Sequence, residues 1–162
     1  MATRTLVVML MLGLLSACAD SDRRAGVTFT SAEGVAIGGY DPVAYFTEGA
    51  ATKGSPEYSA EHGRATWWFA NAEHRDSFIA NPKAYTPAYG GWCAYGVAEG
   101  YAAETDPVNG WTIYEGRLYL NWDAEVAAAW NADRAALLEK SEAYWPGVNQ
   151  QLSDGSATVH WH

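Results

Sequence analysis

The stretch Tyr58–Ala80 reads YSAEHGRATWWFANAEHRDSFIA. Its first half carries aromatic and β-branched residues on both sides of His62-Gly63, which indicates a β-hairpin. Its second half begins with Asn71, a residue type favoured at helix N-caps, and predicts a helix over Ala72–Ala80. A hairpin that runs directly into a helix is therefore the unit around which we assemble the rest of the fold.

The same alternation appears on both sides of this unit. Upstream, Asp41-Pro42 is typical of a helix start and predicts a short helix over Val43–Phe46. Downstream, the turn residues Glu115-Gly116 predict a second hairpin, and a long Ala-rich helix is expected between Asp123 and Pro146-Gly147. Hairpins that alternate with helices, without the long spacing of βαβ units, predict one α+β domain with a small antiparallel sheet of two hairpins.

Composition and charge exclude several classes of protein. The chain has 162 residues, enough for about one domain. It is 49% hydrophobic and 14% aromatic, which excludes a disordered chain, because such chains lack apolar surface to bury. Its formal net charge of −9 has the wrong sign for binding to nucleic acid, so we expect no nucleic-acid partner.

The first residues have the pattern of a bacterial secretion signal. The apolar run Leu6–Leu15 is too short to span a membrane, and Leu15-Ser16-Ala17-Cys18 resembles a lipobox, in which Cys18 is lipidated. Because Ala19 rather than Asp follows, the sorting rule favours a lipid anchor in the outer membrane, facing the periplasm. The alternative is ordinary cleavage that leaves Cys18 as a free thiol.

These features divide the chain into four parts: a signal peptide over residues 1–18, a flexible tether over 19–34, a folded domain over 35–148 and a polar tail over 149–162. With Cys18 lipidated, Cys93 is the only remaining cysteine. We therefore expect no intramolecular disulfide, although the compartment is oxidising.

Four sequence blocks together resemble the secreted, stand-alone branch of the YHS-domain family: AIGGYDPVAYF, WWFANAEHRDSFIANPKAY, YGGWCAYGVA and GRLYLNW. The resemblance implies a small α+β module related to metal-sensing and metal-trafficking domains, in which cysteines that follow an aromatic strand bind metal. This chain departs from that pattern, because Ala70, Asn71 and Ala72 occupy the cysteine region. The resemblance also implies that the reactive position corresponds to Cys93.

Cys93 is the first candidate for chemistry. It follows Gly90-Gly91, and if a helix starts at Trp92 the helix dipole lowers the pKa of the thiol and favours a thiolate. His74 is the candidate second ligand, since an imidazole and a thiolate together suit Cu(I) or Zn(II). The alternatives are a buried structural Cys93 and a His74 on a solvated, charged helix face.

Four further residues are candidates for a ligand pocket: Tyr40, Asp41, Trp92 and Tyr95. The simpler interpretation is that Asp41 caps a helix and that the aromatic rings belong to the core. His160 and His162 form an H-x-H pair that we expect to bind metal adventitiously at most, because a flexible tail is poorly preorganised.

These observations lead to one leading function and two alternatives. The leading hypothesis is a lipid-anchored, non-catalytic binding module for a soft metal, copper or zinc, held through Cys93. The first alternative is a thiol-based redox protein in which Cys93 cycles through a sulfenic acid or a mixed disulfide. The second is a structural or small-ligand module without a reactive cysteine. Motifs of hydrolases, NTPases, dehydrogenases and zinc proteases are absent from the sequence, and no catalytic residue is predicted.

Overall fold

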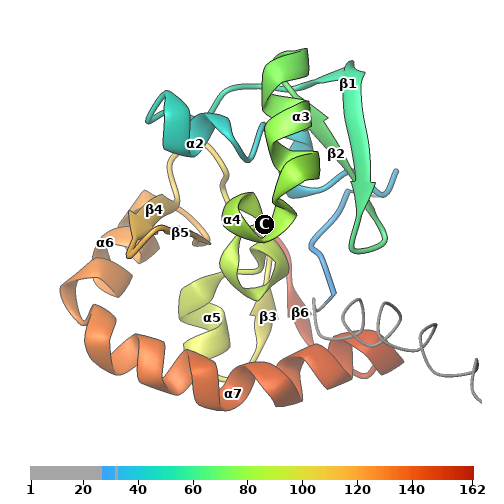
Figure 1. Ribbon diagram of the computed structural model, residues 1–162. Coiled ribbons are helices and arrows are strands. Elements are labelled where there is room, and N and C mark those ends of the chain that lie inside the picture. The colour runs from blue at the N-terminus through green and yellow to red at the C-terminus, as the bar shows by residue number, and fades with distance from the viewer. Residues whose placement is uncertain (1–26, 32) are drawn as a thin grey trace, which may run out of the picture.

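Short helices and two-stranded sheets alternate along the chain in the computed structural model, which describes residues 27–31 and 33–162 (Figure 1). The helices are η1 (Ile37–Gly39), α2 (Ala44–Thr47), α3 (Ala72–Ala80), α4 (Pro82–Tyr85), η2 (Ala88–Gly91), α5 (Ala94–Ala98), α6 (Ala124–Ala132) and α7 (Arg134–Asp154). The strands are β1 (Ser55–His62), β2 (Ala65–Phe69), β3 (Ala102–Ala103), β4 (Trp111–Tyr114), β5 (Arg117–Leu120) and β6 (Val159–His160). The predicted α+β class is confirmed.

Both predicted hairpins are present. β1 pairs antiparallel with β2 around His62 and Ala65, and β4 pairs antiparallel with β5, in register from Trp111↔Leu120 to Tyr114↔Arg117. The third sheet was not predicted: β3 pairs parallel with β6, and each strand has two residues. Strands of this length carry no recognisable sequence pattern, because alternation needs at least about four residues.

Helix α3 follows the hairpin as predicted, and its start is fixed by a side-chain cap. The Asn71 carboxamide oxygen accepts a hydrogen bond of 2.8 Å from the backbone N–H of His74. Phe78 is buried against the rings of Trp67 and Phe69, at centroid distances of 5.3 and 5.1 Å. Ile79, the next residue of the helix, is 57% exposed and takes no part in this packing.

The long C-terminal helix starts after Asp123 as predicted but differs from its prediction in the middle and at its C-terminal end. It is interrupted at Asp133, which separates α6 from α7, and α7 continues through Pro146 to Asp154. Val148 lies beyond the proline, is 3% exposed and belongs to the core. Its burial favours a helix that continues past Pro146, although proline disfavours the helix interior. Gly155, with φ at 76°, ends α7. The segment predicted as a polar tail is therefore ordered through α7 and β6.

The buried side chains form two clusters that meet at β5. Leu118 and Leu120 pack into the cluster under β1, β2 and α3, whereas Tyr119 packs into the cluster that includes Trp130 of α6 and Val148 of α7. This follows from strand geometry, because successive side chains point to opposite faces. Within the described ranges, no helix is long and apolar enough to cross a membrane.

Candidate functional site

Cys93 lies at the N-cap of α5, which begins at Ala94 rather than at Trp92, the start considered from the sequence. Its Sγ accepts a hydrogen bond of 3.4 Å from the backbone N–H of Gly96, and its own N–H donates to the carbonyl of Ala103 at 3.0 Å. The chain enters this position through left-handed residues, Tyr89 with φ at 55° and Gly90 with φ at 63°. The side chain that results is almost fully buried, with Cys93 2% exposed.

Burial raises the pKa of the Cys93 thiol above its ordinary value. The backbone groups of Gly96, Trp122 and Tyr95 act in the opposite direction and lower this pKa, because N–H donors favour negative charge on sulfur. The effect of burial on the pKa is the larger one, so the expectation that the helix start makes Cys93 a thiolate is wrong. Burial therefore favours the neutral thiol, and the Gly96 N–H lies beside it as a hydrogen-bond donor.

Asn121, which sequence reasoning missed, is the side chain to which the Cys93 thiol donates its hydrogen bond. It follows β5 and is 0% exposed, and its Oδ1 lies 3.9 Å from Cys93 Sγ and accepts a 3.1 Å hydrogen bond from the Tyr95 N–H. Within the described part of the chain, its Nδ2 has no hydrogen-bond partner. A buried donor left unpaired costs about 1–3 kcal/mol. The sequence feature that could have identified Asn121 is its position as an amide directly after an apolar strand, in the block GRLYLNW.

Gly110 holds Asn121 in place by close backbone approach. The Asn121 N–H donates to the Gly110 carbonyl at 2.6 Å, and a Cβ atom on Gly110 would lie 2.3 Å from the Asn121 backbone oxygen. Cβ atoms in proteins essentially never lie within 3.0 Å of such a neighbouring atom. Only glycine therefore fits opposite Asn121.

His74 does not join Cys93 in the structure. Its Nδ1 lies 2.6 Å from Asp41 Oδ2, and its Nε2 lies 3.3 Å from Thr47 Oγ1 and 3.9 Å from Glu48 Oε1. Helix α3, which carries His74, and helix α5 lie in opposite halves of the molecule (Figure 1). The predicted pairing of His74 with Cys93 in one metal site is thus corrected.

The other potential metal ligands of the described chain do not form a metal site either. Among residues 27–31 and 33–162, no group of three or more His, Cys, Asp or Glu side chains is arranged to hold a metal ion. His160 and His162 stack instead on aromatic rings, Tyr101 at 4.6 Å and Trp122 at 3.7 Å between centroids. The structure therefore supplies Cys93 with hydrogen-bond donors rather than with further metal ligands.

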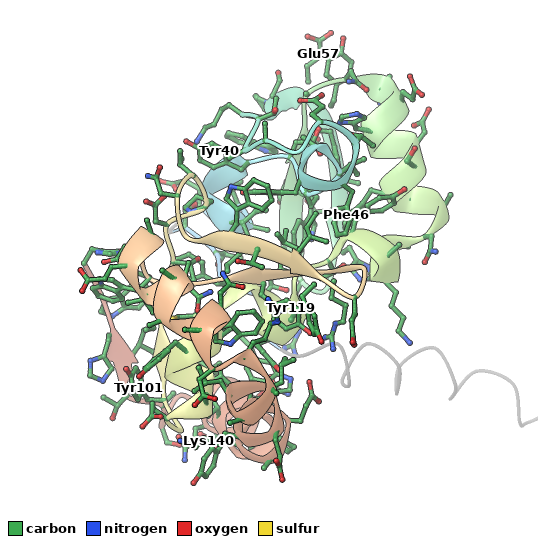
Figure 2. The ribbon with its side chains drawn as sticks, turned by 90° about the vertical axis from the view of Figure 1, so that its left-hand side faces the viewer. Tyr40, Phe46, Glu57, Tyr101, Tyr119 and Lys140 are labelled. Atoms are coloured by element: carbon green, nitrogen blue, oxygen red, sulfur yellow. The ribbon has the colours of Figure 1, made fainter. Side chains whose placement is uncertain are left out.

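The four residues expected to line a ligand pocket fall into two separate places. Asp41 is fully buried beside α2, with Tyr40 next to it under the Lys53 ammonium. Trp92 and Tyr95 flank Cys93, and the Trp92 indole N–H donates to the Val27 carbonyl at 2.9 Å. Figure 2 shows Tyr40 well separated from Tyr101, which lies near α5. A surface groove of about 240 Å³ lies elsewhere and is lined by Val27, Thr28, Thr30, Gly63, Arg64, Leu152 and Ser153.

Comparisons with protein-family models, with curated proteins and with solved structures give no match. The YHS resemblance therefore stays a prediction. So does lipidation, since Cys18 lies outside the described residues. The geometry around Cys93 carries the functional argument.

Proposed function

We propose that this chain is a lipid-anchored protein of the bacterial envelope whose domain works as a thiol-based redox module, with Cys93 as the reacting group. One observation supports the proposal above the others. The carboxamide of Asn121 lies against Cys93 Sγ, and its Nδ2 is buried with no acceptor among the described residues. The atom that faces the thiol is Oδ1, 3.9 Å from Sγ, and the unpaired Nδ2 belongs to the same carboxamide. Because buried donors are normally paired, this Nδ2 indicates where an acceptor atom binds during function.

The chemistry of these neighbours favours oxidation of sulfur over metal binding. The Gly96 N–H donates to Sγ, has no lone pair to give to a cation and stabilises negative charge on sulfur. Asn121 Nδ2 has no acceptor among the described residues and can donate to an oxygen atom bonded to sulfur. A structural Zn(II) site needs about four ligands, and the described residues form no group of three or more Cys, His, Asp or Glu side chains that could hold a metal ion. Copper or zinc binding remains the competing prediction.

The reaction that fits this environment begins with a peroxide. The Cys93 thiolate attacks one peroxide oxygen, the S–O bond forms as the O–O bond breaks, and the leaving hydroxide takes a proton to become water. Sulfur is oxidised by two electrons and the peroxide is reduced. In the sulfenic acid that results, the new oxygen is the acceptor for Asn121 Nδ2.

Reduction requires thiols from outside the domain, since Cys93 is the only cysteine after Cys18. A low-molecular-weight thiol attacks the sulfenic sulfur and releases water, which leaves a mixed disulfide. A second such thiol attacks the mixed disulfide, regenerates Cys93 and leaves as the low-molecular-weight disulfide. Both electrons therefore come from the external thiol.

The test is to expose the full-length protein to hydrogen peroxide and to trap sulfenic acid with a dimedone-type probe, read by mass spectrometry on the peptide that contains Cys93. We expect labelling at Cys93 that increases with peroxide and is lost in Cys93→Ser. Asn121→Asp should reduce the labelling rate at least about tenfold, because a carboxylate opposes negative charge on Sγ. Asn71→Asp, which keeps an N-cap on α3, is the matched control and should not change it.

A second arm separates redox from metal chemistry. The same variants are titrated with Cu(I) and Zn(II) against a competing chelator. An absence of sulfenic acid at Cys93, combined with tight metal binding that disappears in Cys93→Ser, would overturn the redox proposal in favour of the metal module. An absence of both reactions would leave Cys93 as a structural residue.

A further inference from the structure

The segment after α7 returns to the thiol site and lies beside it. Its strand β6 pairs with β3 through Ala102↔Val159 and Ala103↔His160 (Figure 1). The carbonyl of Ala103 accepts the hydrogen bond from the Cys93 N–H at 3.0 Å. Only one strand therefore separates this segment from the backbone of Cys93.

The two histidines of the segment cover the immediate neighbours of Sγ. His160 stacks on Tyr101, whose ring packs against Gly96 so closely that a Cβ there would lie 3.0 Å from Cε2. Gly96 is the residue that donates its N–H to Sγ. His162 stacks on Trp122 and its Nε2 lies 3.0 Å from the Trp122 carbonyl. His160 ends β6 and His162 follows it by two residues, so one short segment brings both rings to the surroundings of Cys93.

Val159 packs against the core, and the Trp161 ring lies 6.2 Å from Trp92 and 6.3 Å from Phe29, between centroids. The other contacts that hold the segment lie at the surface. β6 has two residues, and His160, Trp161 and His162 are all exposed, with Trp161 58% exposed. The remaining polar contacts include the Glu104 N–H to His160 carbonyl bond of 3.0 Å. Segments with few buried contacts open at a free energy far below that of global unfolding. Cys93, at 2% exposed, needs such an opening before any reagent can reach it.

We infer that Ser156–His162 is a strap that closes over Cys93, fastened by the stacking of His160 and His162, and that its opening controls access of peroxide and external thiol to Sγ. This inference rests on the proposed redox function. Opening also changes the chemistry of the sulfur. It reduces the burial that opposes the thiolate, while the Gly96 N–H, which belongs to α5, stays in place.

The experiment measures access and oxidation separately, with the full-length protein as reference. Access is the rate of alkylation of Cys93 by iodoacetamide at fixed pH, read on the Cys93 peptide. We compare the double variant His160→Ala/His162→Ala and a variant that lacks residues 156–162. Both should be alkylated at least about tenfold faster than the parent, since labelling of a buried group follows the population of the open state. His62→Ala is the matched control, because His62 also packs against an aromatic ring, Phe78 at 5.8 Å, but in the β1–β2 hairpin.

The possible outcomes distinguish the two proposals. Unchanged alkylation in both strap variants, with the near-ultraviolet circular dichroism of a folded domain, would overturn the strap and leave the redox proposal as it stands. Faster alkylation without trapped sulfenic acid under peroxide would support the strap as a cover of Cys93 and overturn the redox function. Faster alkylation with faster sulfenic acid formation supports both.

Discussion

Asp41 Oδ2 lies 2.6 Å from His74 Nδ1, and the same carboxylate accepts hydrogen bonds from three backbone N–H groups. Those groups belong to Val43 and Ala44 at the start of α2 and to Ala70 at the end of β2, at 2.8, 3.3 and 2.8 Å. One fully buried side chain thus ties α2, β2 and α3 together. Helix capping by Asp41, the simpler sequence interpretation, is confirmed, and the tie to His74 is added to it.

Asp41→Ala should therefore destabilise the domain by about 3 kcal/mol or more, because it leaves several buried donors without an acceptor at once. The matched control is Asp123→Ala, which removes a cap that accepts one hydrogen bond, from the Val126 N–H at 2.8 Å. That control should lose about 1 kcal/mol. Urea unfolding followed by tryptophan fluorescence measures both changes. Equal losses in the two variants would contradict the role of Asp41 as a tie between three elements.

Two glycine substitutions should change stability in opposite directions. Gly110→Ala forces a Cβ to 2.3 Å from the Asn121 backbone, so we expect a loss of about 2 kcal/mol or more from backbone displacement. Gly147→Ala places its Cβ in open space within α7, where alanine is the better helix former, and should stabilise by about 0.5–1 kcal/mol. Thermal and urea unfolding report both. Because Gly110 positions Asn121, its substitution should also slow sulfenic acid formation, whereas Gly147→Ala should not.

The raised pKa of Cys93 makes stability depend on pH in a defined direction. The folded-state pKa lies above that of an unfolded cysteine, about 8.5, so the neutral thiol contributes stability that is complete below pH 8.5. That contribution is lost as the pH rises through the folded-state pKa. The stability difference between the parent and Cys93→Ser should therefore shift against the parent from pH 7 to pH 10. Thiolate absorbance at 240 nm should show a titration midpoint that falls when the protein is unfolded in urea.

Local signals in the sequence were sufficient for several elements of the fold. Asn71 and Asp123 were identified as helix caps from residue type, and each accepts the expected hydrogen bond. The turn at Glu115-Gly116 has positive φ at both residues, 48° and 72°, as a tight hairpin requires. These features depend on residues within a few positions of each other, which is why the sequence alone predicts them.

The parts that were missed depend on contacts between distant residues. The Asp41–His74 bond joins residues 33 positions apart, and β3 meets β6 across the whole C-terminal helical region. The pKa of Cys93 was predicted in the wrong direction because burial depends on the packed domain, whereas the helix start is a local feature. The site at Asn121 was missed for the same reason, since its amide meets the thiol only after β5 and α5 pack together.

The position of His74 gives a prediction about metal binding that differs from the sequence hypothesis. If copper or zinc binds through Cys93, His74→Ala should leave the affinity unchanged, because the His74 ring hydrogen-bonds with Asp41 and Thr47 in another part of the molecule. Cys93→Ser should abolish the same binding. Competition titrations of both variants against a chromophoric chelator, with folding verified by circular dichroism, measure the two effects. Equal loss of affinity in two folded variants would require His74 and Cys93 to meet, which the bonds of the Asp41 carboxylate to α2 and β2 oppose.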